Sequence, residues 1–334
     1  MATRFVERFN SLGEIESLPS AAGIGVVDGV PYVNTGGGAA VLSADVSKGK
    51  RYYVAPQDAN ADDVSNSGRS WSEPFASMSP LEDVLTHGDT VFLAGVLKQN
   101  WTSPPAVQDV TIVGVANTPR QATSGGVPGG GGATWMNPGT VASPLLHLGN
   151  TSTTKDVQAW RLVNIFFGQA GAAACVKLSR KITGADPSHA SFIGCKFSGA
   201  DDGIQNVEGS FILVDDCEFF NFTTAGKGGI QSIAGDGVAL PLQCIIRNSK
   251  FWNNVRHIKG AFSSAEIINN LFSWKGSSLT TTVQIDLSGG KNNNVMLNRF
   301  TLAESAGTGT MFQGGTDDSW FNYYAEGAVA GVPI

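Results

Sequence analysis

One short pattern recurs six times between Trp160 and Phe300, at irregular intervals along the chain. Each copy ends in a phenylalanine, and the residue five places earlier is always apolar. The six pairs are Leu162 and Phe167, Phe192 and Phe197, Val214 and Phe219, Ile246 and Phe251, Ile267 and Phe272, and Val295 and Phe300. Successive side chains of a strand point to opposite faces, so two side chains five residues apart cannot both point inward from an unbroken strand. The chain must therefore bend once within each copy.

The bend is expected three residues before each phenylalanine. With one exception, this position holds a residue type that enters a left-handed backbone conformation at low cost. The residues are Asn164, Gly194, Asp216, Asn248, Asn269 and the exception, Leu297. The following position is also expected to point inward, and it holds Ile165, Cys195, Cys217, Ser249, Asn270 and Asn298. Stacked amide side chains at such a position can satisfy one another's hydrogen bonds.

A unit that turns a corner and returns about 20 to 30 residues later is one coil of a parallel β-solenoid. Coils of this kind stack about 4.8 Å apart, and extra residues can leave as loops at a fixed corner. An ordinary β-sandwich is the alternative, but its antiparallel strands recur about every 8 to 12 residues. The spacing therefore predicts an all-β fold, a parallel β-helix of about eight coils.

The composition agrees with this fold and argues against one class of binding partner. The 334 residues include 42 glycines and only 15% charged residues, which favours tight turns and stacked strands over helices. A net charge of −6 argues against a nucleic-acid partner, because phosphate binding needs a basic face. The four cysteines show no metal spacing and are interpreted as buried thiols, although a bridge between Cys195 and Cys217 on neighbouring coils is geometrically possible. They are Cys175, Cys195, Cys217 and Cys244.

Residues 1–50 are interpreted as an arm and a hairpin that form an attachment element. Residues 1–20 are compatible with at most a weak helix, and valines on both sides of Asp28-Gly29 predict a β-hairpin with a two-residue turn. The glycines at 36–38 are expected to be the joint between this appendage and the body. Because a lone hairpin is marginal in water, we expect it to pack on the solenoid, a sister subunit or another protein.

Residues 51–115 are expected to form the first unit of the β-helix, closed by a capping helix. The stretch SPLEDVL predicts a short helix with Ser79 as its cap, Pro80 at the first helical position and Glu82 three residues after the cap. This unit resembles the N-terminal unit of right-handed parallel β-helix proteins of the pectate-lyase-like superfamily, in which a helix plugs the end of the solenoid. The resemblance implies a right-handed β-helix but no activity, since this architecture carries lyases, hydrolases and inert virion spikes.

The remaining chain divides into a loop and the body. Residues 116–154 are rich in glycine and proline and are predicted to be a loop on the outside of the stack. Residues 155–334 are expected to form the β-helix body and a last coil around Trp320, whose open edge needs a cover. The sequence contains neither a signal peptide nor about eighteen consecutive apolar residues, so we expect synthesis in a host cytoplasm and no membrane insertion.

Two acidic pairs are the candidate catalytic groups. The stretch GADDGI with Asp201 and Asp202, and RHIKG at 256–260, resemble the aspartate pair and the basic motif of polygalacturonases. The family's Asn-Thr-Asp and Gly-His-Gly elements are missing, because GQAGAAAC and AGKGGIQS stand in their places. Asp215 and Asp216 form a second pair, but Asp216 lies at a predicted corner. A turn role is favoured over paired-carboxylate catalysis at both sites, and no catalytic, cofactor-binding or metal-binding residue is assigned.

Three further groups of residues could bind a metal ion or a sugar. Two interpretations apply to Asp58, Asn60, Asp62 and Asp63, an oxygen-rich cation site or a solvated turn. The turn is favoured, because the spacing of these residues matches no known calcium loop. The four histidines show neither metal-ligand nor catalytic-triad spacing and are interpreted as structural. They are His87, His147, His189 and His257. An exposed row of tryptophans could hold sugar rings, but covering the solenoid or lining a subunit contact is favoured. These tryptophans are Trp71, Trp101, Trp135, Trp252, Trp274 and Trp320.

A short β-helix with a small N-terminal appendage resembles the tail spikes and surface decorations of tailed bacteriophages. The predicted function is a structural protein on the virion surface, a homotrimeric spike or decoration that residues 1–50 attach to the major capsid protein or to a tail component. Two alternatives are kept. One is a tailspike glycosidase or lyase that degrades host surface polysaccharide, and the other is a non-catalytic adhesin that binds a host surface glycan.

Overall fold

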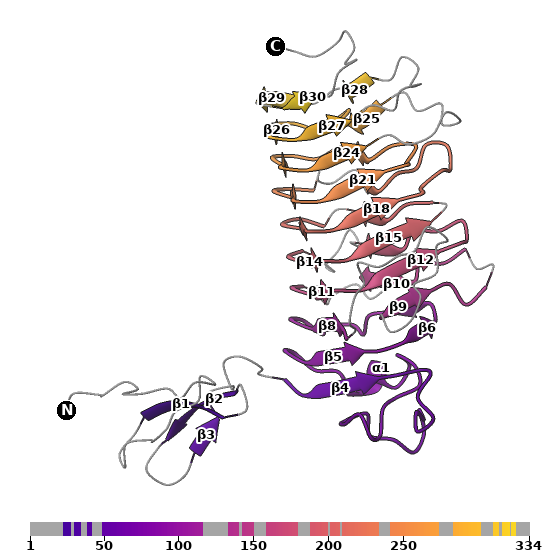
Figure 1. Ribbon diagram of the computed structural model, residues 1–334, viewed down its shortest axis with the longest axis vertical. Helices are drawn as coiled ribbons and strands as arrows, with labels where there is room; N and C mark the ends of the chain where they lie inside the picture. Colours follow the sequence, from indigo (N-terminus) through magenta and orange to yellow (C-terminus); the bar gives the residue numbers. More distant parts are fainter. Residues whose placement is uncertain are drawn as a thin grey trace.

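The chain forms an elongated right-handed parallel β-helix, shown by a computed structural model (Figure 1). Three parallel sheets run along its length, and a separate three-stranded antiparallel sheet lies near the N-terminus. The structure describes residues 23–27, 30–34, 39–41, 49–115, 133–139, 142–149, 158–179, 188–199, 201–207, 209–233, 241–273, 283–301, 310–313, 316–320 and 322–324.

Each complete coil contributes one strand to each of three sheets. Sheet 1 contains β4 (Arg51–Val54), β5 (Thr90–Leu93), β8 (Thr111–Gly114), β11 (Arg161–Val163), β14 (Ser191–Ile193), β17 (Leu213–Asp215), β20 (Ile245–Arg247), β23 (Glu266–Ile268), β26 (Asn293–Met296) and β29 (Thr316–Trp320). Sheet 2 contains β6 (Val96–Lys98), β9 (Thr134–Met136), β12 (Phe166–Gln169), β15 (Lys196–Gly199), β18 (Glu218–Phe220), β21 (Lys250–Trp252), β24 (Leu271–Ser273), β27 (Arg299–Thr301) and β30 (Tyr323–Tyr324). Sheet 3 contains β7 (Trp101–Thr102), β10 (Leu146–Gly149), β13 (Val176–Ser179), β16 (Ile204–Val207), β19 (Ile230–Ile233), β22 (Ile258–Gly260), β25 (Val283–Asp286) and β28 (Thr310–Gln313). The eight described strands of sheet 3 belong to eight complete coils, as predicted.

The predicted corner lies between sheet 1 and sheet 2 in every copy of the pattern. All six residues at this position, Leu297 included, have a left-handed backbone with φ between 52° and 61°. The six phenylalanines that follow are fully buried, and the rings of adjacent coils stack with centroids 4.6 to 5.2 Å apart. The corner thus turns the chain so that the apolar residue of sheet 1 and the phenylalanine of sheet 2 both face the core.

The inward position after the corner carries the predicted amide stack. The side-chain oxygen of Asn298 accepts the backbone N–H of Asn270 at 2.8 Å, and that of Asn322 accepts the backbone N–H of Asn298 at 3.0 Å. Each of these asparagines also donates its amide to a carbonyl of sheet 1 on the preceding coil, as Asn298 does to Ile267 at 2.8 Å. The buried amides of this column are therefore satisfied from coil to coil.

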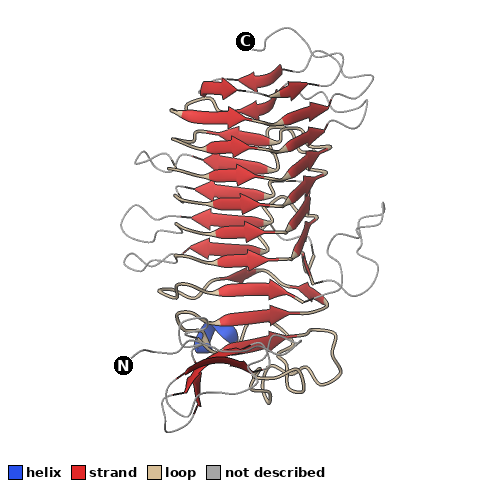
Figure 2. Cartoon of the chain, turned by 60° about the vertical axis from the view of Figure 1, so that its left-hand side comes forward, coloured by secondary structure: helices blue, strands red, loops and turns tan. Residues whose placement is uncertain are grey.

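The N-terminal end of the core is closed by apolar contacts. Helix α1 (Leu81–Val84) lies at this end of the stack (Figure 2), and Leu81 is buried with Phe75 and Met78. The predicted cap at Ser79 with Glu82 is wrong, because the N-cap residue is Pro80 and no side chain bonds to the cap. Ser79 instead accepts a hydrogen bond from the Gln99 side chain at 2.8 Å.

Two expectations for the region before the β-helix body need correction. The hairpin is confirmed, since β1 (Gly23–Val27) pairs antiparallel with β2 (Val30–Asn34) across the predicted turn. However, β3 (Ala39–Val41) pairs with β2, so the glycines at 36–38 connect two strands of one sheet and are not the joint to the body. Similarly, the predicted loop at 116–154 contains β9 and β10, whose Trp135 and Leu146 are buried in the core in spite of the neighbouring glycines. Residues 1–20 lie outside the described residues.

Candidate functional site

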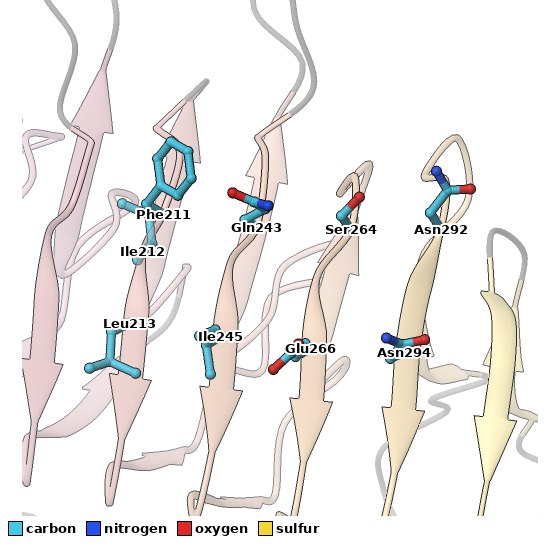
Figure 3. A pocket seen from close by; sticks show the side chains of 9 residues that line it. All are labelled: Phe211, Ile212, Leu213, Gln243, Ile245, Ser264, Glu266, Asn292 and Asn294. Atoms are coloured by element: carbon cyan, nitrogen blue, oxygen red, sulfur yellow. The ribbon is translucent and has the colours of Figure 1, made fainter.

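A groove of about 490 Å³ runs along the outside of sheet 1 across four coils (Figure 3). Each coil contributes one residue from the turn before its sheet 1 strand and one from the strand itself. The turn residues are Phe211, Gln243, Ser264 and Asn292, and the strand residues are Leu213, Ile245, Glu266 and Asn294. Because the four strands β17, β20, β23 and β26 pair in register, the two columns run parallel to the long axis of the β-helix. The groove can therefore hold an extended chain that crosses the strands.

The turn residues of the groove form a second left-handed corner. Their φ values lie between 50° and 57°, and two of them, Phe211 and Gln243, are residue types that seldom adopt this conformation. The Phe211 ring is 42% exposed and stacks on the His189 ring of the preceding coil at 4.8 Å. The Phe211 ring therefore presents an aromatic face to solvent at one end of the groove.

Four polar side chains of the groove are available for a ligand. Within the described part of the chain, the side chains of Gln243, Ser264, Glu266 and Asn294 make no hydrogen bond to other protein atoms. Glu266 is exposed and is the single charged residue among the lining residues that the structure describes. The groove therefore combines an apolar end with an end that offers amide, hydroxyl and carboxylate groups.

The carboxylates of Asp201 and Asp202 both form an ion pair with one lysine. Both carboxylates contact the Lys227 ammonium, at 3.0 and 3.3 Å, and the Gly228 N–H donates to Asp202 at 2.9 Å. The Asp202 side chain is fully buried, and burial raises the pKa of this carboxyl while Gly228 and Lys227 act in the opposite direction. Asp202 thus faces protein groups and has no surface with which to contact a substrate.

The side chains of the basic motif at 256–260 are also bound to other groups of the protein. Arg256 forms an ion pair with Asp286 at 3.2 Å, and Lys259 donates to the Gly226 carbonyl at 3.1 Å. Asp202, Lys227 and Arg256 precede β16, β19 and β22, so the structure brings the two motifs to one edge of sheet 3. The partner that the sequence did not predict is Lys227, which stands in the stretch where the polygalacturonase pattern has its Gly-His-Gly.

The remaining acidic residues hold turns and strands together. Asp215 forms an ion pair with Arg247 at 2.7 Å on the next coil, and Asp216 lies at the left-handed corner as predicted. In the loop of the first unit, Asp58 accepts the N–H of Asn60 and Asp62 accepts those of Val64 and Ser65, as expected for turns. Asp63 differs, because it accepts the N–H groups of Ala76 and Ser77, which are 13 and 14 residues away.

The tryptophans do not form an exposed row along the described chain. Trp101 and Trp135 are buried in the core, so neither can hold a sugar ring, and Trp135 stacks on Phe167. Trp71 is 41% exposed against Tyr53, while Trp252 stacks on Phe220 and donates to Glu218 at 2.7 Å. Trp274 lies outside the described residues, and the side chain of Trp320 is not described.

The histidines and cysteines have packing roles. Burial lowers the pKa of His257 to about 3, and its ring lies between Phe251 and Phe272. Burial, with a contribution from Lys177, lowers the pKa of His147 to about 4, and its ring bonds to Ser179 at 2.9 Å. The four cysteines are buried free thiols, as interpreted from the sequence, and burial raises the pKa of Cys244 to about 12.

Comparisons with known proteins identify the fold. No family model and no curated protein sequence matches the chain. The pectate lyase Pel9A is similar in structure, with 12% identity and a TM-score of 0.50 over 84% of this chain and 78% of its own. The Streptococcus pneumoniae surface adhesin PfbA has 10% identity and a TM-score of 0.49 over 71% of this chain and 59% of its own, so the chain spans little more than half of that adhesin. ORF18 of Geobacillus virus E2 has 11% identity and a TM-score of 0.38 over 97% of this chain and 75% of its own.

The likeness to Pel9A agrees with a right-handed parallel β-helix and leaves the activity open, because one fold carries many functions. The structure adds that no helix among the described residues is long and apolar enough to cross a membrane.

Proposed function

We propose that this protein is a structural surface protein of a tailed-bacteriophage particle, a spike or decoration whose β-helix projects from the capsid or the tail. The observation that carries the proposal is the continuous bonding of the β-helix from coil to coil. Stacked rings and an amide column link successive coils through the core. Eight complete coils at about 4.8 Å each give a rigid spacer on the order of 40 Å long.

Residues 1–50 are the proposed attachment element. The strands β1, β2 and β3 form an antiparallel sheet of their own, and none of them pairs with the three parallel sheets. A small sheet of this kind is marginal alone and is stabilised by packing on another surface. This organisation supports an N-terminal part that docks on a particle protein while the parallel sheets form the projecting body.

The outer face of sheet 1 supports association of three copies side by side. Over the first five strands one of its two outward columns is apolar, half-buried and in register: Tyr53, Phe92, Val113, Val163 and Ile193. The other outward column holds polar or charged residues, Arg51, Thr90, Thr111, Arg161 and Ser191. The matching column of sheet 3 is polar or charged at every coil from His147 to Asp286. An apolar stripe on the outer face of one sheet is a surface that three copies can bury when they associate around a common axis.

The acidic pair supports a non-catalytic body. Hydrolysis by paired carboxylates requires both groups to reach the glycosidic bond. Asp202 is fully buried and bound to Lys227, and Asp201 is bound to the same ammonium. The glycosidase alternative therefore lacks an accessible second carboxylate at this site.

A deletion tests the attachment. We expect a chain without residues 1–50 to be soluble and folded, and to be missing from purified particles that carry the full-length chain at defined positions in electron micrographs. Full occupancy by the truncated chain contradicts the attachment role. Absence of the full-length chain from particles contradicts the virion assignment.

A substitution pair tests the trimer. Val163→Lys places a charge in the apolar stripe and is expected to reduce the mass measured by light scattering from that of a trimer to that of a monomer. Thr102→Lys places the same charge on sheet 3 and is expected to leave the trimer intact. Equal masses for the two variants contradict the stripe as the contact.

A further inference from the structure

We propose that the groove over β17, β20, β23 and β26 is a binding site for an uncharged, extended oligosaccharide, which it holds without cleaving it (Figure 3). The two columns of lining residues cross four coils along the axis of the β-helix. Coils repeat about every 4.8 Å, roughly the length of one pyranose unit in an extended chain. Each coil therefore presents its pair of side chains to about one sugar ring.

The exposed ring of Phe211 provides the first argument for a ligand. Phe211 lies at the left-handed corner that recurs before the sheet 1 strands, with a φ of 56°, and it is 42% exposed although it is a large aromatic residue. The His189 ring fixes the Phe211 ring by stacking on it at 4.8 Å, with the planes only 10° apart. A rigid aromatic face at the end of a groove is a suitable platform for the apolar face of a sugar ring.

The hydrogen-bonding groups provide the second argument. Beyond the Phe211 end, the lining changes to Gln243, Ser264, Glu266 and Asn294, whose side chains make no hydrogen bond to described protein atoms. Together they offer donors and acceptors on successive coils, which matches the hydroxyl groups of a sugar chain. In contrast, the amides of the inward column are all bonded to protein.

The charge of the groove selects the class of glycan. Its described lining contains one carboxylate, Glu266, and no Lys, Arg or His. An anionic polysaccharide such as a polyuronate meets a negative charge here and no cation to neutralise it. The basic residues Lys227, Arg256 and Lys259 lie at sheet 3 and are bound to carboxylates or to a carbonyl. The groove on sheet 1 is therefore suited to neutral sugars.

Cleavage is not expected in this groove. Hydrolysis needs two carboxyl groups on opposite sides of the scissile bond, and Glu266 is the single carboxylate of the described lining. The proposal concerns the isolated chain, so it stands or falls independently of attachment to a particle.

Affinity electrophoresis of the full-length chain tests this site. The gels contain either neutral polymers of glucose, galactose, mannose, rhamnose or N-acetylhexosamine, or polygalacturonate and alginate as anionic polymers. We expect at least one neutral polymer to retard the protein and the two anionic polymers to leave its mobility unchanged. Phe211→Ala is expected to weaken the retardation at least ten-fold, and Asn294→Ala about three-fold or more. Both side chains lie outside the core, and a far-ultraviolet spectrum and an unfolding curve check that the variants fold.

Matched variants separate the groove from general adhesion. Leu242 is 43% exposed next to the groove but does not line it, so Leu242→Ala is expected to keep the retardation. Glu266→Lys is expected to introduce binding to an anionic polymer. The proposal is overturned if no neutral polymer binds, if Phe211→Ala and Asn294→Ala both bind like the unaltered protein, or if the unaltered protein binds the anionic polymers alone.

Discussion

The middle and the C-terminal coils of the β-helix satisfy the same carbonyl groups in different ways. In two middle coils the inward residue after the corner is a cysteine, and the thiols of Cys195 and Cys217 contact a sheet 1 carbonyl of the preceding coil at 3.4 Å. In the C-terminal half an asparagine takes this place, and the amides of Asn270, Asn298 and Asn322 donate to the equivalent carbonyls at 2.8 to 3.0 Å. One corner geometry therefore accepts either apolar packing with a weak S–H contact or a continuous chain of amide hydrogen bonds.

The outer face of sheet 1 also changes along the β-helix. The apolar column from Tyr53 to Ile193 is interrupted on the next two coils by the ion pair between Asp215 and Arg247, and it continues with Ile268 and Met296. The groove with its amide and hydroxyl groups begins at Phe211 and extends to β26. The difference supports a division of the two proposed contacts, with self-association in the N-terminal half and a ligand in the C-terminal half.

The largest effect is expected where the two halves meet. Phe219 lies between Phe197 and Phe251 at 4.6 and 4.8 Å and is fully buried. Phe219→Ala leaves a cavity in the ring stack and is expected to lower the free energy of unfolding by about 3–5 kcal/mol, measured in urea. The exposed Phe211→Ala serves as the control and is expected to change it by less than about 0.5 kcal/mol. Similar losses in the two variants contradict the ring column as the main source of stability.

Asn298→Ala and Cys217→Ala compare the two kinds of inward residue directly. Asn298 accepts from the Asn270 backbone and donates to Ile267 and Asn322, so its removal leaves several buried polar groups without partners. We expect a loss of about 2–3 kcal/mol in the free energy of unfolding. Cys217→Ala removes a small packed group and a weak contact, and about 1 kcal/mol is expected. Equal losses in urea unfolding contradict the distinction between the amide and the thiol coils.

These differences show which features a sequence can predict. The corner, the buried phenylalanines and the amide column were predictable because they repeat at fixed distances from Phe167, Phe197 and the later phenylalanines, and because Asn and Gly favour left-handed turns. The groove was not predicted, because its left-handed positions hold residues such as Phe211 and Gln243 that carry no turn signal. The bond between Lys227 and Asp202 was not predicted either, since it depends on the register of two coils separated by a loop of variable length.

The region before residue 155 shows where local sequence patterns predict structure and where they fail. Local patterns predicted the hairpin at Asp28-Gly29 correctly, because the turn is contained in the two residues themselves. The strands β9 and β10 were missed because glycine and proline dominate their surroundings, although Trp135 and Leu146 are core residues. Burial supplied by neighbouring coils outweighs local composition at these positions.

The pH dependence of stability is expected to reflect His257 in the C-terminal half. Burial lowers its folded pKa to about 3, whereas the unfolded value is about 6.5. The unfolded chain therefore binds more protons below pH 6.5, so the stabilisation is complete above that pH and declines as the pH falls toward 3. About 2 kcal/mol of the free energy of unfolding is expected to be lost from this group between pH 7 and pH 5.

His257→Gln tests this assignment, because glutamine can still accept the hydrogen bond that Asn254 gives to the ring at 3.1 Å. Urea unfolding at pH 7 and pH 5 is expected to show a smaller loss for the variant than for the unaltered protein. His147 and the carboxyl groups titrate in both proteins and cancel in the difference. An identical loss in both proteins means that the acid sensitivity comes from other groups.

The smallest effect concerns the one corner that departs from the pattern. Leu297 is 42% exposed and has a φ of 56°, a conformation that costs leucine about 1–2 kcal/mol more than asparagine or glycine. Leu297→Asn is expected to raise the free energy of unfolding by about 1 kcal/mol. The reciprocal change Asn269→Leu, at the same corner one coil earlier, is expected to lower it by a similar amount and also removes the bond from Asn269 to Asn248 at 2.8 Å. If Leu297→Asn destabilises the protein in urea, the leucine contributes a contact at the C-terminal end that outweighs its backbone strain, and the corner rule does not hold at the edge of the stack.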